Sequence, residues 1–157
     1  MKGRRLLLGV WVCAIAAVST TYGEGLSTPF ADVEMQAVAL GQSYVVRDAE
    51  GHGLRVKNLG ASPIRVVIDV LTPQRAQLRP GAEPIPDVHW VEVHPVVLEL
   101  GAHEEKESVI TLRVPRNKTF RRRYFQVMIW SRGSPSQAQG MSISAGLLSK
   151  LRFHTKG

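Results

Sequence analysis

The sequence predicts an all-β fold, built as an antiparallel β-sandwich. Short segments in which apolar and polar residues alternate recur along the chain, and turn residues separate them about every 8–12 residues. Beyond the first 23 residues, no segment repeats its apolar residues at the three- and four-residue spacing of an amphipathic helix. About seven strands of this kind on a chain of this length indicate an immunoglobulin-like sandwich.

The segment 141–153 has the clearest alternation and closes the chain. Its odd positions are apolar almost throughout, and its even positions are mostly small, polar or basic. Side chains on a strand alternate between two faces, so we expect a long strand with Met141, Ile143 and Leu147 on its buried face. Lys150 and Arg152 then lie on the polar face. We expect earlier strands to pair with this one.

The other strands are shorter, and the first is broken into two parts. The expected ranges are 33–40 with 44–46, then 54–59, 64–71, 89–94, 95–101, 108–114 and 124–130. The strand 124–130 is apolar on both faces apart from Gln126, which is typical of a central strand. The segment 72–87, with four prolines, is expected to be a long surface loop or an irregular edge, and 131–140 is expected to be a loop.

The first 23 residues predict a secretory signal peptide. Three basic residues precede an apolar run at 6–18, and small residues suited to cleavage follow, with cleavage after Ser19 or after Gly23. An uncleaved membrane anchor is the alternative, but the run is shorter than the ~20 residues that a spanning helix needs. Residues 24–157 are therefore expected to form a single domain, periplasmic or secreted.

The composition excludes several classes of function. The one cysteine, Cys13, lies in the predicted leader, so an exported chain would have no disulfide. Loss of the three basic leader residues lowers the formal net charge from +7 to +4, which does not imply a nucleic-acid partner. No later run is long enough to span a membrane. Without a G-x-S-x-G motif or a cysteine nucleophile, we expect neither an enzyme nor a cofactor.

Two further groups of residues suggest ligand sites. Three arginines at 121–123 form a basic patch for an anionic partner or, alternatively, a solvated turn. His89 and His94 with Glu92 between them resemble metal ligands in type. On a strand, however, the two histidines would point to opposite faces and no further ligand is near, so we expect no metal site.

Four segments, in order, resemble the N-terminal domain of PapD-like periplasmic pilus chaperones. They are Leu54-Arg-Val-Lys-Asn-Leu-Gly-Ala-Ser-Pro63, His94-Pro-Val-Val-Leu-Glu-Leu-Gly101, Tyr124-Phe-Gln-Val-Met-Ile-Trp130 and the Lys150-Leu151 pair in the closing strand. The resemblance implies an immunoglobulin-like domain that holds unfolded or incomplete pilus subunits. It also implies that the last strand is lent to the subunit by β-strand addition.

In this family a basic pair anchors the terminal carboxylate of the subunit. Lys150 matches the lysine of that pair, whereas the matching arginine would lie near 42–44, where this sequence has no basic residue. The family's second domain would begin near His154, three residues before the end of the sequence. The usual cleft between two domains is therefore not expected within this chain.

The sequence thus predicts an exported module that binds a peptide or subunit strand, either chaperone-like or accessory in pilus or envelope assembly. The alternative is a structural component of a surface or envelope assembly without chaperone activity. The expected partner-binding residues are Lys150, Arg152, Met141, Ile143 and Leu147. The polar face of the closing strand has another interpretation, a solvated face whose basic residues protect an edge from aggregation.

Overall fold

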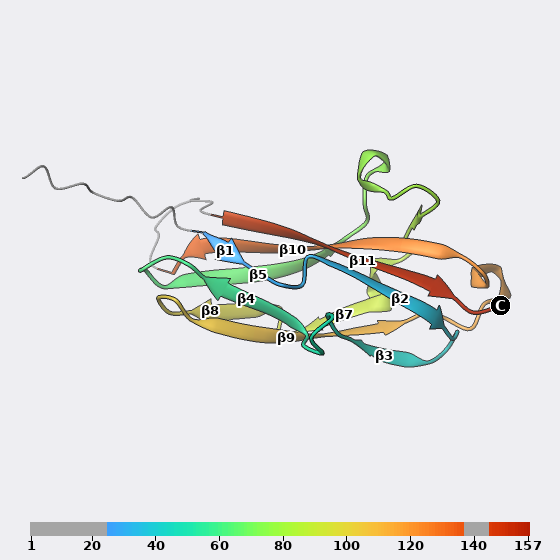
Figure 1. The fold of residues 1–157 in the computed structure, drawn as a ribbon, viewed down its shortest axis with the longest axis horizontal. Helices are drawn as coiled ribbons and strands as arrows, with labels where there is room; N and C mark the ends of the chain where they lie inside the picture. Colours follow the sequence, from blue (N-terminus) through green and yellow to red (C-terminus); the bar gives the residue numbers. More distant parts are fainter. Residues whose placement is uncertain (1–24, 137–144) are drawn as a thin grey trace, which may run out of the picture.

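The structure is a computed structural model that describes residues 25–136 and 145–157. These residues form two β-sheets packed face to face, with three short 3-10 helices and no α-helix (Figure 1). The 3-10 helices are η1 (Arg75–Gln77), η2 (Val88–Trp90) and η3 (Lys118–Phe120). The predicted immunoglobulin-like sandwich is confirmed.

The first sheet holds five strands, all paired antiparallel. Their order is β1 (Leu26–Ser27), β4 (Leu54–Asn58), β9 (Glu105–Arg113) and β3 (Ser43–Val46), with β7 (Val91–His94) also paired to β9. Its outer face is open and carries mixed polar and apolar side chains.

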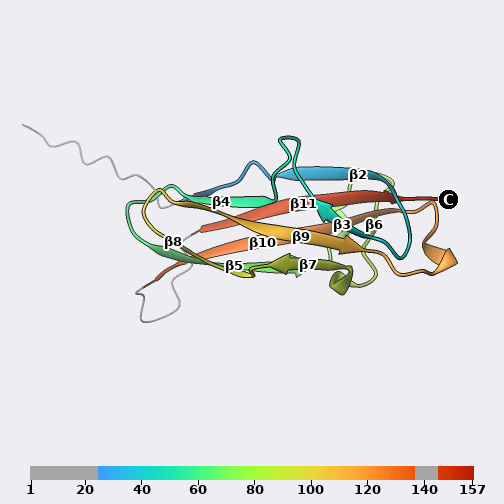
Figure 2. The same cartoon turned by 90° about the horizontal axis from the view of Figure 1, so that it is seen from below.

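The second sheet holds six strands and contains the closing strand. Their order is β2 (Asp32–Val38), β11 (Ala145–Thr155), β10 (Tyr124–Pro135), β5 (Ile64–Leu71) and β8 (Val97–Leu100), with β6 (Glu83–Pro84) also paired to β10. The β2–β11 and β6–β10 pairs are parallel, and the others are antiparallel. The long β10–β11 pair runs along most of the molecule (Figures 1 and 2).

The N-terminal segment changes twice from one sheet to the other. β1 pairs with β4 in the first sheet, β2 with β11 in the second, and β3 with β9 in the first again. The predicted break in the first strand is therefore a change of sheet. At this turn Gly41 has a φ of 76°, and a Cβ atom there would lie 2.4 Å from Cγ of Arg116, so the position favours glycine.

The core confirms that the odd positions of the closing strand form its buried face. Leu151 and Phe153 are fully buried between the sheets, and Leu147 is partly buried against the same core. Phe153 packs against Phe125, which meets the buried ring of Trp90 edge-on at 5.7 Å between centroids. Burial of large apolar side chains on both inner faces stabilises the sandwich without disulfides.

Several predicted boundaries differ from the structure. β9 begins at Glu105 and not at 108, and residues 88–90 form η2 and not the start of a strand. The segment 131–135 is the end of β10 and not a loop, because its small residues Ser131 and Gly133 fit between β5 and β11. The closing strand runs from Ala145 to Thr155 in the described residues. Its predicted beginning at Met141 lies outside them.

The segment 72–87 projects as an arm from the second sheet (Figure 1). Gln126 of β10 holds it: its side chain donates to the Gln77 carbonyl at 2.7 Å and accepts from the Arg79 N–H at 2.9 Å. Gln126 and Met128 are buried although they lie on the same outer face of β10 as the exposed Trp130. The arm explains why β10 reads as apolar on both faces, with Gln126 as the exception.

Candidate functional site

β11 has one half that is paired on both sides and one half that is not. β10 pairs with it from Ala145 to His154, but β2 joins its other side only from Lys150 onward. Among the described residues, no strand pairs with Ala145–Ser149 on the side away from β10. We call this segment the free edge. An unpaired strand edge is a template for pairing with another chain.

The direction of the backbone groups at the free edge follows from one hydrogen bond. The N–H of Lys150 donates to the carbonyl of Ala31 at 2.9 Å, so Lys150 directs its backbone away from β10. In an antiparallel pair, alternate residues direct both backbone groups to the same side. Gly146 and Leu148 therefore present their N–H and C=O groups at the free edge.

Apolar side chains border the free edge on the outer face of the sheet. Leu148 is 46% exposed and lies opposite Trp130, which is 37% exposed. They line a groove of about 390 Å³ together with Leu71, Met128 and the start of the arm. The guanidinium of Arg132 lies 5.3 Å from the centre of the Trp130 ring. A partner strand at the free edge would therefore meet apolar surface beside it.

Lys150 lies at the junction between the free edge and β2. Its side chain is exposed and forms no ion pair with any described residue. It lines a groove of about 280 Å³ on the outer face, with Arg79 from the arm, Arg152 from its own strand and Asp32 of β2, whose carboxylate is paired with Arg152. Its ammonium group is thus available to an anionic group that reaches this groove.

Arg152 is at an even position of β11, so its side chain lies on the outer face of the sheet, but it is not solvated. It is only 6% exposed, its Nη2 lies 2.5 Å from Asp32 Oδ1, and its Nη1 lies 3.1 Å from Glu34 Oε2. Burial opposes its charge, but the hydrogen bonds to Asp32 and to the Tyr124 hydroxyl outweigh it and raise the pKa of Arg152. The expectation of a solvated face fails here, because the parallel neighbour β2 supplies both carboxylates.

Residues 42–44, where the arginine of the family's basic pair was expected to match, do not lie beside Lys150. They lead into β3, which pairs in the other sheet. The strand beside β11 is β2, where Asp32 and Glu34 face Arg152. This neighbour supplies acidic groups in place of a second base.

Of the remaining predicted partner-binding residues, only Leu147 belongs to the described part of β11, where it lies on the inner face. Leu147 packs against the core at the free edge. Met141 and Ile143 lie outside the described residues. The hydroxyls of Ser131 and Ser149 on the same inner face are buried and find no hydrogen-bond partner among the described residues.

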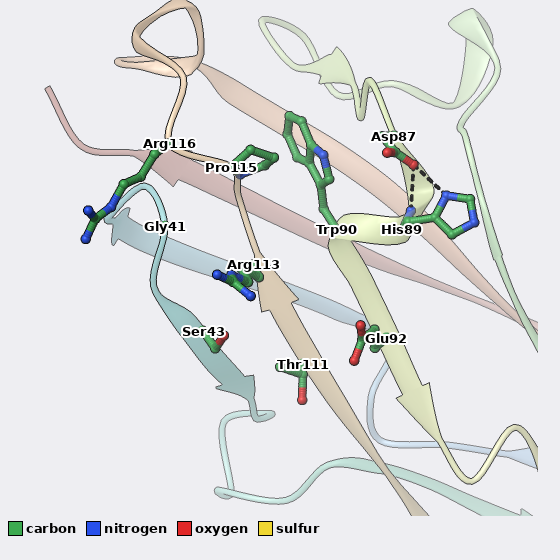
Figure 3. A pocket seen from close by; sticks show the side chains of 10 residues that line it. All are labelled: Gly41, Ser43, Asp87, His89, Trp90, Glu92, Thr111, Arg113, Pro115 and Arg116. Carbon is green, nitrogen blue, oxygen red and sulfur yellow. Dashed lines mark hydrogen bonds and ion pairs between the residues drawn. The ribbon is translucent and has the colours of Figure 1, made fainter.

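A larger groove of about 730 Å³ lies on the outer face of the first sheet (Figure 3). On one wall, Asp87 accepts hydrogen bonds from the backbone N–H of His89 at 2.9 Å and from its ring at 2.7 Å, which lower the pKa of Asp87. Arg113 lies between the two sides at the end of β9, and Arg116 lies on the side away from Asp87 and His89. Within residues 25–136 and 145–157, no group of three or more His, Cys, Asp or Glu could hold a metal ion.

The described fold is similar to several solved structures. A PapD-like domain of human CEP192 (domain 7) superposes with a TM-score of 0.63 and 12% identity, over 98% of this chain and 99% of that one. The YadV chaperone superposes with a TM-score of 0.53 and 14% identity, over 84% of this chain and 52% of that one. The chain has a PapD-like fold.

A third match is a chain from the Salmonella enterica complex of SafA pilin with the SafB chaperone. It superposes with a TM-score of 0.52 and 16% identity, over 84% of this chain and 58% of that one. The chain spans about half the length of the YadV chaperone and of the chain matched in the SafA–SafB complex. No protein-family model matches the sequence, and no curated protein matches it significantly. None of the helices in the described part has the length and apolar character needed to cross a membrane.

Proposed function

We propose that this PapD-like chain is an exported module that binds a strand of a partner protein at the free edge of β11. Its role would be chaperone-like or accessory in the assembly of a pilus or another envelope structure. The observation that carries the proposal is the free edge itself, where Gly146 and Leu148 leave backbone donors and acceptors without a strand partner in the described chain. Main-chain hydrogen bonds supply affinity in β-strand addition, and alternate side chains supply specificity.

An added strand would lie in line with β2 and end where β2 begins. Lys150 stands at that junction, where its own N–H already bonds to Ala31. A partner strand that ends in a carboxylate there would form a charge-assisted hydrogen bond with the Lys150 ammonium group. Arg152 would support the junction by holding Asp32 and not by touching the partner.

The side chains of the partner strand would alternate between two surroundings. Those on the outer face would meet Leu148 and Trp130, which are already half exposed. Those on the inner face would lie beside Leu147, which packs against the core. The favoured partner is therefore a peptide strand with apolar residues on both faces at its centre.

Peptide binding to a Lys150→Ala variant tests the anchor. Peptides with a free terminal carboxylate, taken from strand-donating exported proteins, should bind the native chain in calorimetric titrations. The variant should bind them about tenfold more weakly, since a hydrogen bond to a charged group is lost.

Lys57→Ala is the matched control, because Lys57 is exposed, lies on β4 of the other sheet and forms no ion pair among the described residues. Absence of binding, or equal affinity of the Lys150→Ala and native chains, would contradict the anchor. A partner complex that never exchanges with free peptide would instead indicate a structural component of an assembly.

A further inference from the structure

The charges of this chain are segregated along the sequence. Residues 108–157 contain ten lysines and arginines and neither aspartate nor glutamate. Six of these ten side chains gather around one end of the sandwich, where the described chain ends (Figure 1): Arg113, Arg116, Lys118, Arg121, Arg122 and Lys156. We call this the basic end.

The cations of the basic end differ from those elsewhere in the molecule. In the described part of the chain, none of the six forms an ion pair. Six other basic residues each have a carboxylate partner: Arg55, Arg65, Lys106, Arg123, Arg132 and Arg152. The arginine triplet of the sequence is divided accordingly, because Arg123 binds Glu83 while Arg121 and Arg122 pair with no carboxylate among the residues that the structure describes. Within the described residues, no carboxylate side chain therefore pairs directly with the cations of this end.

Four of these cations line one concave site. A pocket of about 390 Å³ is formed by Arg116, Lys118, Arg121 and Lys156, with Ala39, Leu40 and Gly157 completing its wall. No acidic side chain of residues 25–136 or 145–157 lines it. Arg116 also borders the large groove on the first sheet, where it projects past Gly41 (Figure 3). Arg116 thus borders both hollows.

The backbone around this pocket is fixed by hydrogen bonds. Gly41 donates to the Val114 carbonyl at 2.7 Å, and its missing side chain leaves the space that the Arg116 stem occupies. Lys156 donates to the Val38 carbonyl at 2.9 Å, and Arg121 donates to the Lys118 carbonyl at 3.2 Å. The four cations therefore extend from anchored positions after β9, around η3 and after β11.

We propose that the basic pocket binds a phosphoryl group, carried either by a phospholipid headgroup or by a free phosphate compound. Inorganic phosphate or a phosphate monoester carries about −1.5 to −2 charges at neutral pH and at least three acceptor oxygens. A phospholipid headgroup carries one charge on its phosphodiester, but an anionic membrane presents many such groups to the four cations together. The planar forks of Arg116 and Arg121 match phosphate oxygens, and the lysines add point charges.

The phosphoryl site is separate from the free edge of β11. The free edge lies near the start of β11, whereas the basic end lies beyond its last residues, at the other end of the molecule (Figure 1). This inference therefore goes beyond the proposed strand binding and does not depend on it.

Paired double variants test the site. Arg116→Gln with Arg121→Gln removes two charges from the pocket, and Lys57→Gln with Arg75→Gln removes two exposed cations that lie elsewhere and have no ion pair in the described chain. The probes are inorganic phosphate, followed by NMR titration, and vesicles of phosphatidylglycerol with phosphatidylcholine, followed by co-sedimentation. Vesicles of phosphatidylcholine alone serve as the uncharged surface.

The pocket variant should bind the anionic vesicles at least about tenfold more weakly than the native chain, and the control variant should lose far less. Binding of both probes assigns the site to phosphate chemistry in general. Binding of anionic vesicles alone assigns it to headgroups, and binding of inorganic phosphate alone assigns it to a soluble ligand. The proposal is overturned if neither probe binds, or if the two double variants lose affinity equally.

Discussion

Replacement of Asn58 by alanine is expected to lower the free energy of unfolding by roughly 3 kcal/mol. The Asn58 side chain donates to the carbonyls of Ser62 and Gly101 at 2.8 and 2.9 Å and accepts from the Gly60 N–H at 2.9 Å. It is 1% exposed, so water does not replace the lost partners. The three bonds join the turn after β4 to the end of β8. The Asn-containing turn of the sequence therefore stabilises the fold.

Urea unfolding of Asn58→Ala and Asn117→Ala measures this effect against a matched control. Asn117 also accepts hydrogen bonds, from the backbone N–H and hydroxyl of Thr119 at 3.0 and 2.9 Å, but it is exposed. Its loss should cost about 1 kcal/mol or less, as for an exposed cap. Equal losses for the two variants would show that the buried amide does not tie the turn to β8.

Replacement of Leu148 by proline is expected to abolish strand binding while leaving the sandwich folded. The Leu148 N–H points to the free edge and not to β10, so its removal breaks no bond within the described sheet. Proline is tolerated on an unpaired strand edge, but it removes one donor and places its ring where a partner backbone would lie. Affinity for strand peptides should fall by at least about tenfold.

Leu148→Ala separates the backbone effect from the side chain. Alanine removes the apolar surface beside Trp130 but keeps the N–H group, so it should retain most of the affinity that proline abolishes. Urea midpoints of the two variants verify that both remain folded. If the proline and alanine variants bind peptides equally well, the partner does not pair with this edge.

The sandwich itself was predictable because its signals are local. The alternation in β5 predicted the strand 64–71 at both ends, and the odd parity of the closing strand placed Leu151 and Phe153 in the core. The end of β10 was not predicted, because Ser131 and Gly133 resemble turn residues in type. They are small residues that fit between two neighbouring strands, which only the pairing reveals.

The candidate site was predictable only in part, because it depends on which strands become neighbours. Periodicity placed Arg152 on the outward parity of β11, but its partner Asp32 lies 120 residues earlier in the sequence. Likewise, Gln126 was visible as the polar exception in an apolar strand, yet its bonds to the arm are non-local. The free edge follows from where β2 begins to pair, and no pattern in β11 marks that position.

Amide hydrogen exchange at Gly146 and Leu148, measured with and without a strand peptide, tests the central claim most directly. In the free protein these two N–H groups should exchange rapidly, while that of Ser149, directed toward β10, should be protected. A bound strand should slow exchange at Gly146 and Leu148 and leave Ser149 almost unchanged. A peptide that binds without protecting Gly146 and Leu148 would contradict strand addition at the free edge of β11.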